Sequence, residues 1–310
     1  MTLWEEIVDA MNVLSGEHPG YRAAHAKGVV ATGSFTATAE AAAICRAPHL
    51  QGDTVETTVR LSNGSGDPEA PDADRREGRG LAVKFHLDGG DATDIVSVSI
   101  PVFMVRAPED FLEFLHARVP DPDTGELDME RIGAFLQQHP ETAAALQLIL
   151  PALTPPRSYA TVAYNSLHAF RFLNAEGEAR HGRYRWIPEA GEETLADEEI
   201  ETAERDYLQR EIGERLGSGA VQFTLELKLP GEGDPLDDPT VLWPDDRETV
   251  TLGRLEVCEL IEEPLDPPLV NDPMRLCDGI EPSEDRILAA RPHAYGVSVE
   301  RRLAAHPASG

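Results

Sequence analysis

The sequence has few cysteines and few basic residues, and it has no long hydrophobic run. Only three cysteines occur in 310 residues, Cys45, Cys258 and Cys277, and none forms a CxxC pair. This excludes a disulfide framework and a thiolate zinc site, and an odd count is typical of a reducing, cytoplasmic compartment. No stretch approaches the roughly 20 apolar residues of a membrane helix. No basic region precedes the acidic N-terminus, so we expect no secretion signal.

Acidic residues outnumber basic residues two to one. The chain has 27 Lys and Arg against 56 Asp and Glu, which gives a net charge of −29. Such a surface repels phosphate, so we exclude nucleic acids and anionic membranes as partners. We interpret the charge as a solubility feature. The hydrophobic fraction of 41% is typical of an ordinary soluble protein, and the length allows one large domain or two smaller ones.

Short strands dominate both halves of the chain, with helices between them. Alternating small, β-branched and polar residues predict strands within 25–62 and at 81–87, 93–100, 101–106, 158–165, 168–174, 181–188, 220–229 and 248–261. Apolar spacing and composition predict helices at 3–14, 109–117, 128–138, 141–150, 194–216 and from near Ser283. Turn-rich loops fill 63–80 and 230–246. We therefore expect an α+β fold with an antiparallel β-barrel core and attached helices.

Four short segments carry the functional signal. They are YRAAHAKG at 21–28, VRLS at 59–62, GRGLAVKF at 78–85, and GIEPS at 279–283 running on to RPHAY at 291–295. In this order they resemble the haem catalase family, and most closely its short catalase-related peroxidase branch. The resemblance implies one catalase-like haem-binding domain over 1–310, with a core of about 20–302. It also implies that the N-terminal arm and C-terminal helical domain of large catalases are lacking.

The last segment contains the expected iron ligand. In the family a tyrosine phenolate binds the haem iron and an arginine four residues earlier contacts it, which implies these roles for Tyr295 and Arg291. Residues four apart share one face of a helix. A free tyrosine has a pKa near 10, so a cation is needed to hold its anion. Asp285 also matches a family position and is expected to orient the guanidinium. An isolated RxxxY would more often be a core tyrosine.

On the opposite side of the haem, the resemblance implies that His25 is the distal base. Peroxide cleavage needs a group that takes a proton from one oxygen and returns it to the other, and histidine suits both steps near neutral pH. The family serine that fixes this ring corresponds to Ser62. Typical catalases place an asparagine beside the peroxide, where this chain has Val98, with Ser99 as the neighbouring donor. The remaining histidines, His168 among them, are interpreted as surface or core residues.

Guanidinium groups can hold the haem propionates with paired hydrogen bonds. The resemblance assigns this role to Arg22, Arg60 and Arg302, although the adjacent Arg301 leaves the third assignment open. Phe103 and Phe111 match family residues near the haem, and a purely structural core role explains them equally well.

The departures from the family favour a wide, apolar distal pocket. Gly64 stands near the position of a channel valine, and Glu77 at that of a channel aspartate. With Val98 these changes predict a haem b peroxidase that reduces hydrogen peroxide or organic hydroperoxides with a small organic electron donor and has weak catalase activity. We expect no bound NADPH, and a homodimer in place of an arm-exchanged tetramer.

Two other readings remain open. One is a hydroperoxide-rearranging haem enzyme similar to allene oxide synthase, which needs no external donor. The other is a non-enzymatic haem-binding protein, although simple storage needs no distal base such as His25.

Overall fold

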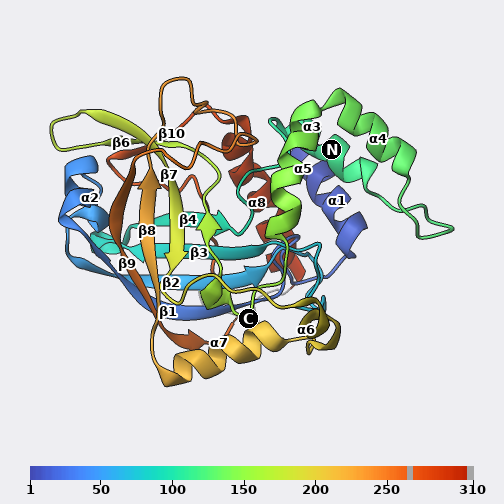
Figure 1. The fold of residues 1–310 in the computed structure, drawn as a ribbon, viewed down its shortest axis with the longest axis horizontal. Coiled ribbons are helices and arrows are strands. Elements are labelled where there is room, and N and C mark those ends of the chain that lie inside the picture. Colours follow the sequence, from blue (N-terminus) through green and yellow to red (C-terminus); the bar gives the residue numbers. More distant parts are fainter. Residues whose placement is uncertain (264–267, 306–310) are drawn as a thin grey trace.

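An eight-stranded antiparallel barrel forms the centre of the computed structural model, which describes residues 1–263 and 268–305 (Figure 1). The strand order is β7-β5-β4-β3-β2-β1-β9-β8, and pairing of β8 with β7 closes the barrel. Its strands are β1 Gly28–Ala37, β2 Thr54–Asn63, β3 Arg79–His86, β4 Ala92–Val98, β5 Tyr164–Asn165, β7 Ala179–Pro188, β8 Val221–Lys228 and β9 Thr249–Ile261. Strands β6 (Phe170–Leu173) and β10 (Ile280–Pro282) extend the sheet beyond β7. The expected α+β barrel is confirmed.

Alternation along the strands fills the barrel interior. In β8 every second residue, beginning with Val221, is buried, because successive side chains point to opposite faces of a strand. Phe35 and Trp186 are fully buried in this core, where each large apolar side chain stabilises the fold by about 1.5–3 kcal/mol. A Cβ at Gly253 would lie 2.4 Å from the Phe35 ring, so the barrel wall accepts only glycine there.

A helical lobe packs against one side of the barrel. It contains α1 (Leu3–Ser15), α3 (Pro108–Ala117), α4 (Met129–Gln138) and α5 (Pro140–Ala152). Helix α8 (Arg286–Ala305) lies between this lobe and the barrel (Figure 1) and contacts α1 and α3. Smaller helices flank the barrel: α2 Ala39–Ile44, α6 Asp197–Thr202, α7 Tyr207–Ser218, and the 3-10 turns η1 Pro48–Leu50, η2 Asp88–Gly90 and η3 Tyr159–Thr161. Among the described helices, none is long and apolar enough to cross a membrane.

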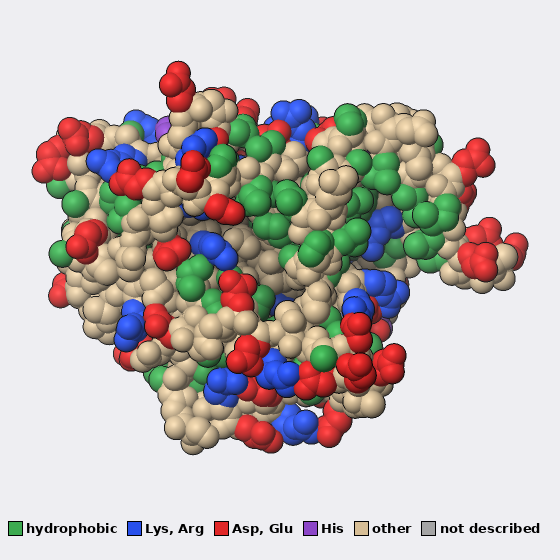
Figure 2. Space-filling view, in the orientation of Figure 1, with side chains coloured by type: hydrophobic (Ala, Val, Ile, Leu, Met, Phe, Trp, Pro, Cys, Tyr) green, Lys and Arg blue, Asp and Glu red, His purple; other side chains and the backbone are tan. Residues whose placement is uncertain are grey.

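Acidic and hydrophobic side chains occupy different parts of the surface. Figure 2 shows acidic side chains spread over the barrel and the outer loops, whereas hydrophobic side chains gather where α3 and α5 meet the barrel. This distribution agrees with the excess of acidic residues in the sequence.

Two expected elements are wrong, and a third, the strand expected over 158–165, consists of the 3-10 turn η3 and the two residues of β5. The helix expected over 194–216 is two helices, α6 and α7, because the carbonyl of Arg205 between them accepts hydrogen bonds from Lys27 Nζ and from the N–H of Asp72. The strand expected over 101–106 is irregular. Pro101 has no N–H for a strand ladder, and the N–H of Phe103 instead donates to the carbonyl of Pro239.

Candidate active site

His25 occupies an unusual backbone conformation just before β1. Its φ is +55°, a left-handed value that non-glycine residues seldom adopt. Its N–H donates to the carbonyl of Gly64 at 3.1 Å, and its ring Nδ1 lies 3.0 Å from the Ser62 hydroxyl oxygen. A Cβ at Gly80 would lie 2.8 Å from both Nδ1 and Cε1 of the ring. Ser62 and Gly80 therefore fix the ring from two sides.

The surroundings of His25 keep its ring neutral. Burial first, and then the positive charges of Arg60, Arg291, Arg22 and Arg79, together lower the pKa of His25 to about 3. The side chain keeps partial exposure. With Nδ1 bound to Ser62, the other ring nitrogen has no hydrogen-bond partner within residues 1–263 and 268–305. A neutral imidazole with a free nitrogen can accept a proton.

Helix α8 carries the second functional pair. Arg291 donates to the phenolic oxygen of Tyr295 from Nε at 3.1 Å and from a terminal nitrogen at 2.6 Å. The four-residue spacing brings the two side chains together on one helix face, and the helix continues through Pro292. Two donors from one guanidinium therefore fix the position of the phenolic oxygen.

A buried pair lies at the start of α8, and sequence reasoning missed it. His168 Nδ1 lies 2.6 Å from Asp285 Oδ2, and each side chain is 1% exposed. Asp285 also accepts from the N–H groups of Ile287 and Leu288 and so caps the helix. The expected contact between Asp285 and Arg291 is thus replaced by one to His168. Nothing in the sequence signals this pair, because 117 residues separate its members.

Burial lowers the pKa of His168, the bond to Asp285 works against this, and the charge of Arg291 lowers the pKa again. His168 is therefore close enough to Arg291 to sense its charge. The interpretation of His168 as an ordinary core residue omitted this relation to the Arg291–Tyr295 pair.

Three arginines gather around the Glu263 carboxylate and the carbonyl of Leu269. Arg22 donates to Glu263 at 3.0 Å, and both Arg22 and Arg302 donate to the carbonyl of Leu269 at 3.3 Å. Arg60 Nε lies 3.6 Å from the other oxygen of Glu263, beyond hydrogen-bond reach. Burial, followed by the charge of Arg22, lowers the pKa of Arg60 to about 10.

The adjacent arginine lies elsewhere. Arg301 pairs with Asp9 on α1, so Arg302, and not Arg301, shares the carbonyl of Leu269 with Arg22.

The two halves of the site come from opposite ends of the chain. The N–H of Ala23, two residues before His25, donates to the hydroxyl of Ser298, one turn beyond Tyr295, at 3.1 Å. This bond and the effect of Arg291 on the pKa of His25 place the His25 segment beside α8.

Four other residues that the sequence analysis singled out have contacts of their own: Val98, Ser99, Gly64 and Glu77. A Cβ at Gly78 would lie 3.3 Å from Val98, and one at Gly64 would lie 3.1 Å from a Glu77 carboxylate oxygen. The Ser99 hydroxyl accepts from the N–H of Arg79.

Phe103 and Phe111 pair with each other, with ring centroids 5.4 Å apart. They pack on the helical-lobe core that includes Ile287 of α8, so the structure displays their core role.

The chain matches the Catalase family over residues 5–308 and belongs to it. A catalase-related peroxidase of Mycolicibacterium paratuberculosis is 38% identical over 304 residues, covering 96% of this chain and 94% of that protein. Another, of Synechococcus elongatus, is 35% identical and covers 96% and 88%.

Longer catalases match over part of their length. A catalase of Vibrio vulnificus is 29% identical over 92% of this chain and 58% of its own. A solved fungal catalase superposes with a TM-score of 0.81 at 24% identity, covering 96% of this chain and 62% of that one, which shows the shared fold. The family and its catalase-related peroxidases identify this chain as an oxidoreductase that acts on peroxide.

Proteins of this family typically bind haem, and the residues present fit that group. The carboxylate of Glu263 already lies between Arg22 and Arg60, which shows that this arginine cluster accepts a carboxylate such as a propionate. Arg60 Nε is buried without a hydrogen-bond partner, so a donor remains for such a ligand. The phenolic oxygen of Tyr295 is of the type that can bind haem iron.

Proposed function

We propose that this chain is one haem-binding domain, spanning 1–310, that works as a peroxidase. It reduces hydrogen peroxide or organic hydroperoxides with a small organic electron donor, and it has weak catalase activity. The cofactor is haem b. The observation that carries the proposal is the Arg291–Tyr295 pair on α8, together with the His25–Ser62 pair that lies beside the same helix.

Each residue has a definite task. Tyr295 would hold the iron through its phenolic oxygen, and Arg291 fixes the position of that oxygen by donating two hydrogen bonds to it. Arg22, Arg60 and Arg302 hold the propionates. When bound, the haem supplies the redox chemistry at its iron.

His25 moves the proton. Its free ring nitrogen would take a proton from one peroxide oxygen and return it to the other, which leaves as water or an alcohol when the O–O bond breaks. The two electrons for this cleavage would come from the bound haem and be restored by the organic donor. Ser62 holds Nδ1 at 3.0 Å and thereby fixes the orientation of the ring. Burial keeps the ring neutral and ready to accept.

Val98 favours organic hydroperoxides over hydrogen peroxide as substrates. Its methyl groups cannot donate a hydrogen bond to a peroxide oxygen, and they offer apolar contact to an alkyl substituent. The neighbouring Ser99 hydroxyl already accepts from the backbone of Arg79.

The same apolar position favours a second candidate function, rearrangement of a lipid hydroperoxide without a donor. Product analysis separates the two: an isomer or epoxide formed from a fatty-acid hydroperoxide in the absence of donor favours rearrangement, and an alcohol formed only with donor favours the peroxidase. Haem storage without catalysis needs no base in the place of His25.

Absorption spectroscopy and stopped-flow kinetics test the proposal. The purified wild-type protein should show a Soret band with high-spin ferric features, which Tyr295→Phe should lose. His25→Ala should keep the haem and react with peroxide about 10²- to 10⁴-fold more slowly. Matched controls are Tyr21→Phe and His116→Ala, which change exposed side chains and should behave as wild type. An unchanged spectrum in Tyr295→Phe, or an unchanged rate in His25→Ala, would contradict the proposal.

A further inference from the structure

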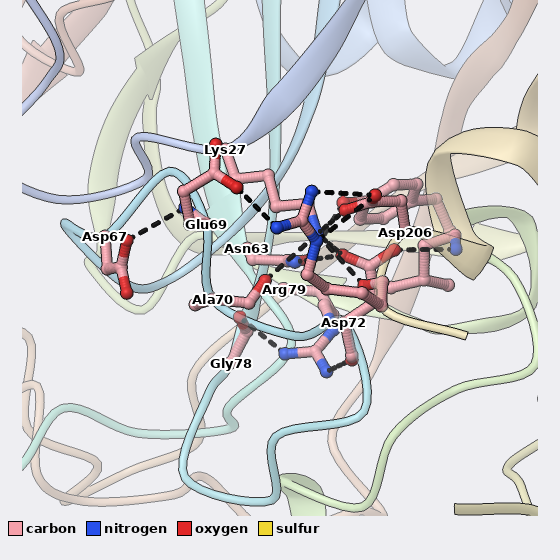
Figure 3. Close-up of polar contacts among 12 residues, drawn as sticks. Lys27, Asn63, Asp67, Glu69, Ala70, Asp72, Gly78, Arg79 and Asp206 are labelled. Atoms are coloured by element: carbon pink, nitrogen blue, oxygen red, sulfur yellow. Dashed lines mark hydrogen bonds and ion pairs between the residues drawn. The ribbon is translucent and has the colours of Figure 1, made fainter. Parts of the chain in front are cut away.

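Asp72 is a buried hydrogen-bond acceptor next to the segments that hold His25. It is 0% exposed and lies in the loop between β2 and β3. Its Oδ1 is 2.7 Å from both Lys27 Nζ and Asn63 Nδ2, and its Oδ2 accepts from the N–H of Leu208 at 2.8 Å. Its main-chain carbonyl accepts from Arg79 at 2.6 Å. Figure 3 shows Lys27, Asn63 and Arg79 converging on Asp72, and we name these four residues the distal clamp.

Lys27, Asn63 and Arg79 are the three arms of the distal clamp. Each of them is one or two positions in sequence from a residue that shapes the site. Lys27 follows His25 by two positions, Asn63 follows Ser62 directly, and Arg79 directly precedes Gly80. Because adjacent residues of a strand point to opposite faces, Ser62 can face the histidine while Asn63 faces the clamp. The three segments that surround the ring therefore share one anchor.

The ring needs such an anchor. His25 has a left-handed φ of +55°, a conformation that persists only where the surrounding structure enforces it. The N–H of Asn63 donates to the carbonyl of Lys27 at 3.0 Å, so the segment of His25 that precedes β1 is joined, beside the clamp, to β2, which carries Ser62. Any widening between them would lengthen the 3.0 Å bond from Ser62 to the ring.

The polar groups of the distal clamp are better suited to fixing distances than to stabilising the fold. Lys27 and Asp72 form an ion pair with side chains 4% and 0% exposed. Burying two charges costs desolvation free energy, and their mutual attraction does no more than offset that cost. Apolar side chains would therefore often stabilise a core equally well. Directed hydrogen bonds, by contrast, fix distances. Tyr159 extends the network by donating to Asn63 Oδ1 at 2.8 Å.

We propose that Asp72 is a positioning residue for the distal site: through Lys27, Asn63 and Arg79 it holds the segments of His25, Ser62 and Gly80 at the separation that fixes the imidazole ring. The inference rests on the proposed function, since it takes His25 as the group that moves the proton.

The main test compares wild type and Asp72→Asn as haem-loaded proteins. Asparagine keeps the size and one acceptor oxygen but removes the charge that anchors Lys27. We expect an unchanged Soret spectrum and an unchanged KM for the electron donor. The rate constant with peroxide should fall about ten- to hundredfold, because small displacements of a catalytic group are costly.

A pH profile supplies a readout that loss of stability alone would not move. In the wild type, burial and the charges of Arg60, Arg291, Arg22 and Arg79 oppose protonation of His25, so the rate should not fall as the pH drops through about 6.5. In Asp72→Asn the loosened ring becomes solvated and its pKa rises toward that value. The protonated fraction then grows as pH falls, and the rate should decrease below about pH 6.5.

Asp206→Asn is the matched control. Asp206 also lies 2.7 Å from Lys27 Nζ, but it is 48% exposed and has no hydrogen bond to Asn63 or Arg79 in the described part of the chain. Its rate should stay within twofold of wild type, with an unchanged pH profile.

A second variant covers the case in which Asp72→Asn does not fold. Asn63→Ala removes the arm beside Ser62, together with the bond from Tyr159, and should reproduce the slower rate and the new acidic limb. If the folded, haem-loaded variants react at the wild-type rate with an unchanged profile, the positioning role is wrong. His25→Ala separates the two hypotheses: a slow His25→Ala with fast clamp variants overturns only this inference, whereas a fast His25→Ala overturns the proposed function.

Discussion

At the scale of single residues, Gly80 sets how close β3 approaches the His25 ring. A Cβ there would lie 2.7 Å from the Ser62 hydroxyl oxygen and 2.8 Å from two ring atoms. Gly80→Ala should therefore displace the ring, keep the haem spectrum, and slow the reaction with peroxide about tenfold or more. Stopped-flow kinetics on the haem-loaded variant provide the measurement.

Gly133→Ala is the control for that change. Gly133 lies inside α4 with open space around it, so alanine should leave the rate unchanged and stabilise the fold by about 0.5–1 kcal/mol. A Gly80→Ala protein as fast as Gly133→Ala would contradict the role of Gly80.

Single residues also show the limit of sequence reasoning at the site. His25, Ser62, Arg60 and Tyr295 stand in short motifs whose neighbours identify them, and the structure brings their segments together. Asp72 has no such motif, because one acidic residue among 56 carries no signal of its hydrogen-bond partners. The His168–Asp285 pair is equally hidden, since its contact depends on how β6 and α8 meet in the folded barrel.

At the scale of elements, α8 matters because it presents Tyr295, and its first turn depends on Asp285. Asp285→Ala removes two hydrogen bonds to helix N–H groups and the partner of buried His168. We expect a loss of about 3 kcal/mol in the free energy of unfolding and weaker haem retention, measured by urea unfolding and by Soret absorbance.

Asp128→Ala provides the comparison for that loss. Asp128 caps the exposed start of α4 through the N–H groups of Glu130 and Arg131. Its removal should cost about 1 kcal/mol and leave haem retention unchanged. Equal losses for the two caps would show that the contact to His168 is unimportant.

Elements with a regular pattern could be predicted and those governed by distant contacts could not. The alternation in β8 and β9 and the capped apolar face of α1 are local properties. The break between α6 and α7 depends on a distant contact, because Lys27, far away in sequence, donates a hydrogen bond to the carbonyl of Arg205. The irregular segment at 101–106 likewise follows from its bond to the loop at Pro239.

At the scale of the whole molecule, charge repulsion opposes folding. With a net charge of −29 and acidic side chains spread over the surface (Figure 2), the compact state suffers more self-repulsion than the unfolded chain. Raising NaCl from about 0.01 M to about 0.15 M shortens the Debye length from ~30 Å to ~8 Å, so the Tm should rise by several degrees.

Thermal unfolding in NaCl and in KCl at equal ionic strength checks this expectation. Both salts should give the same increase, since screening depends on ionic strength. A Tm that stays constant or falls would mean that surface ion pairs outweigh the excess of negative charge.

The bond between Ala23 and Ser298 spans 275 positions of the sequence, and it has a consequence for biosynthesis. Contacts so distant in sequence form late in folding, and a ribosome delivers the N-terminal portion first. The nascent polypeptide therefore exposes the imidazole of His25 long before Tyr295 has been translated. Under the proposed function, haem would be inserted only after the C-terminal helix has been made, and a chain truncated before Tyr295 should fail to retain haem.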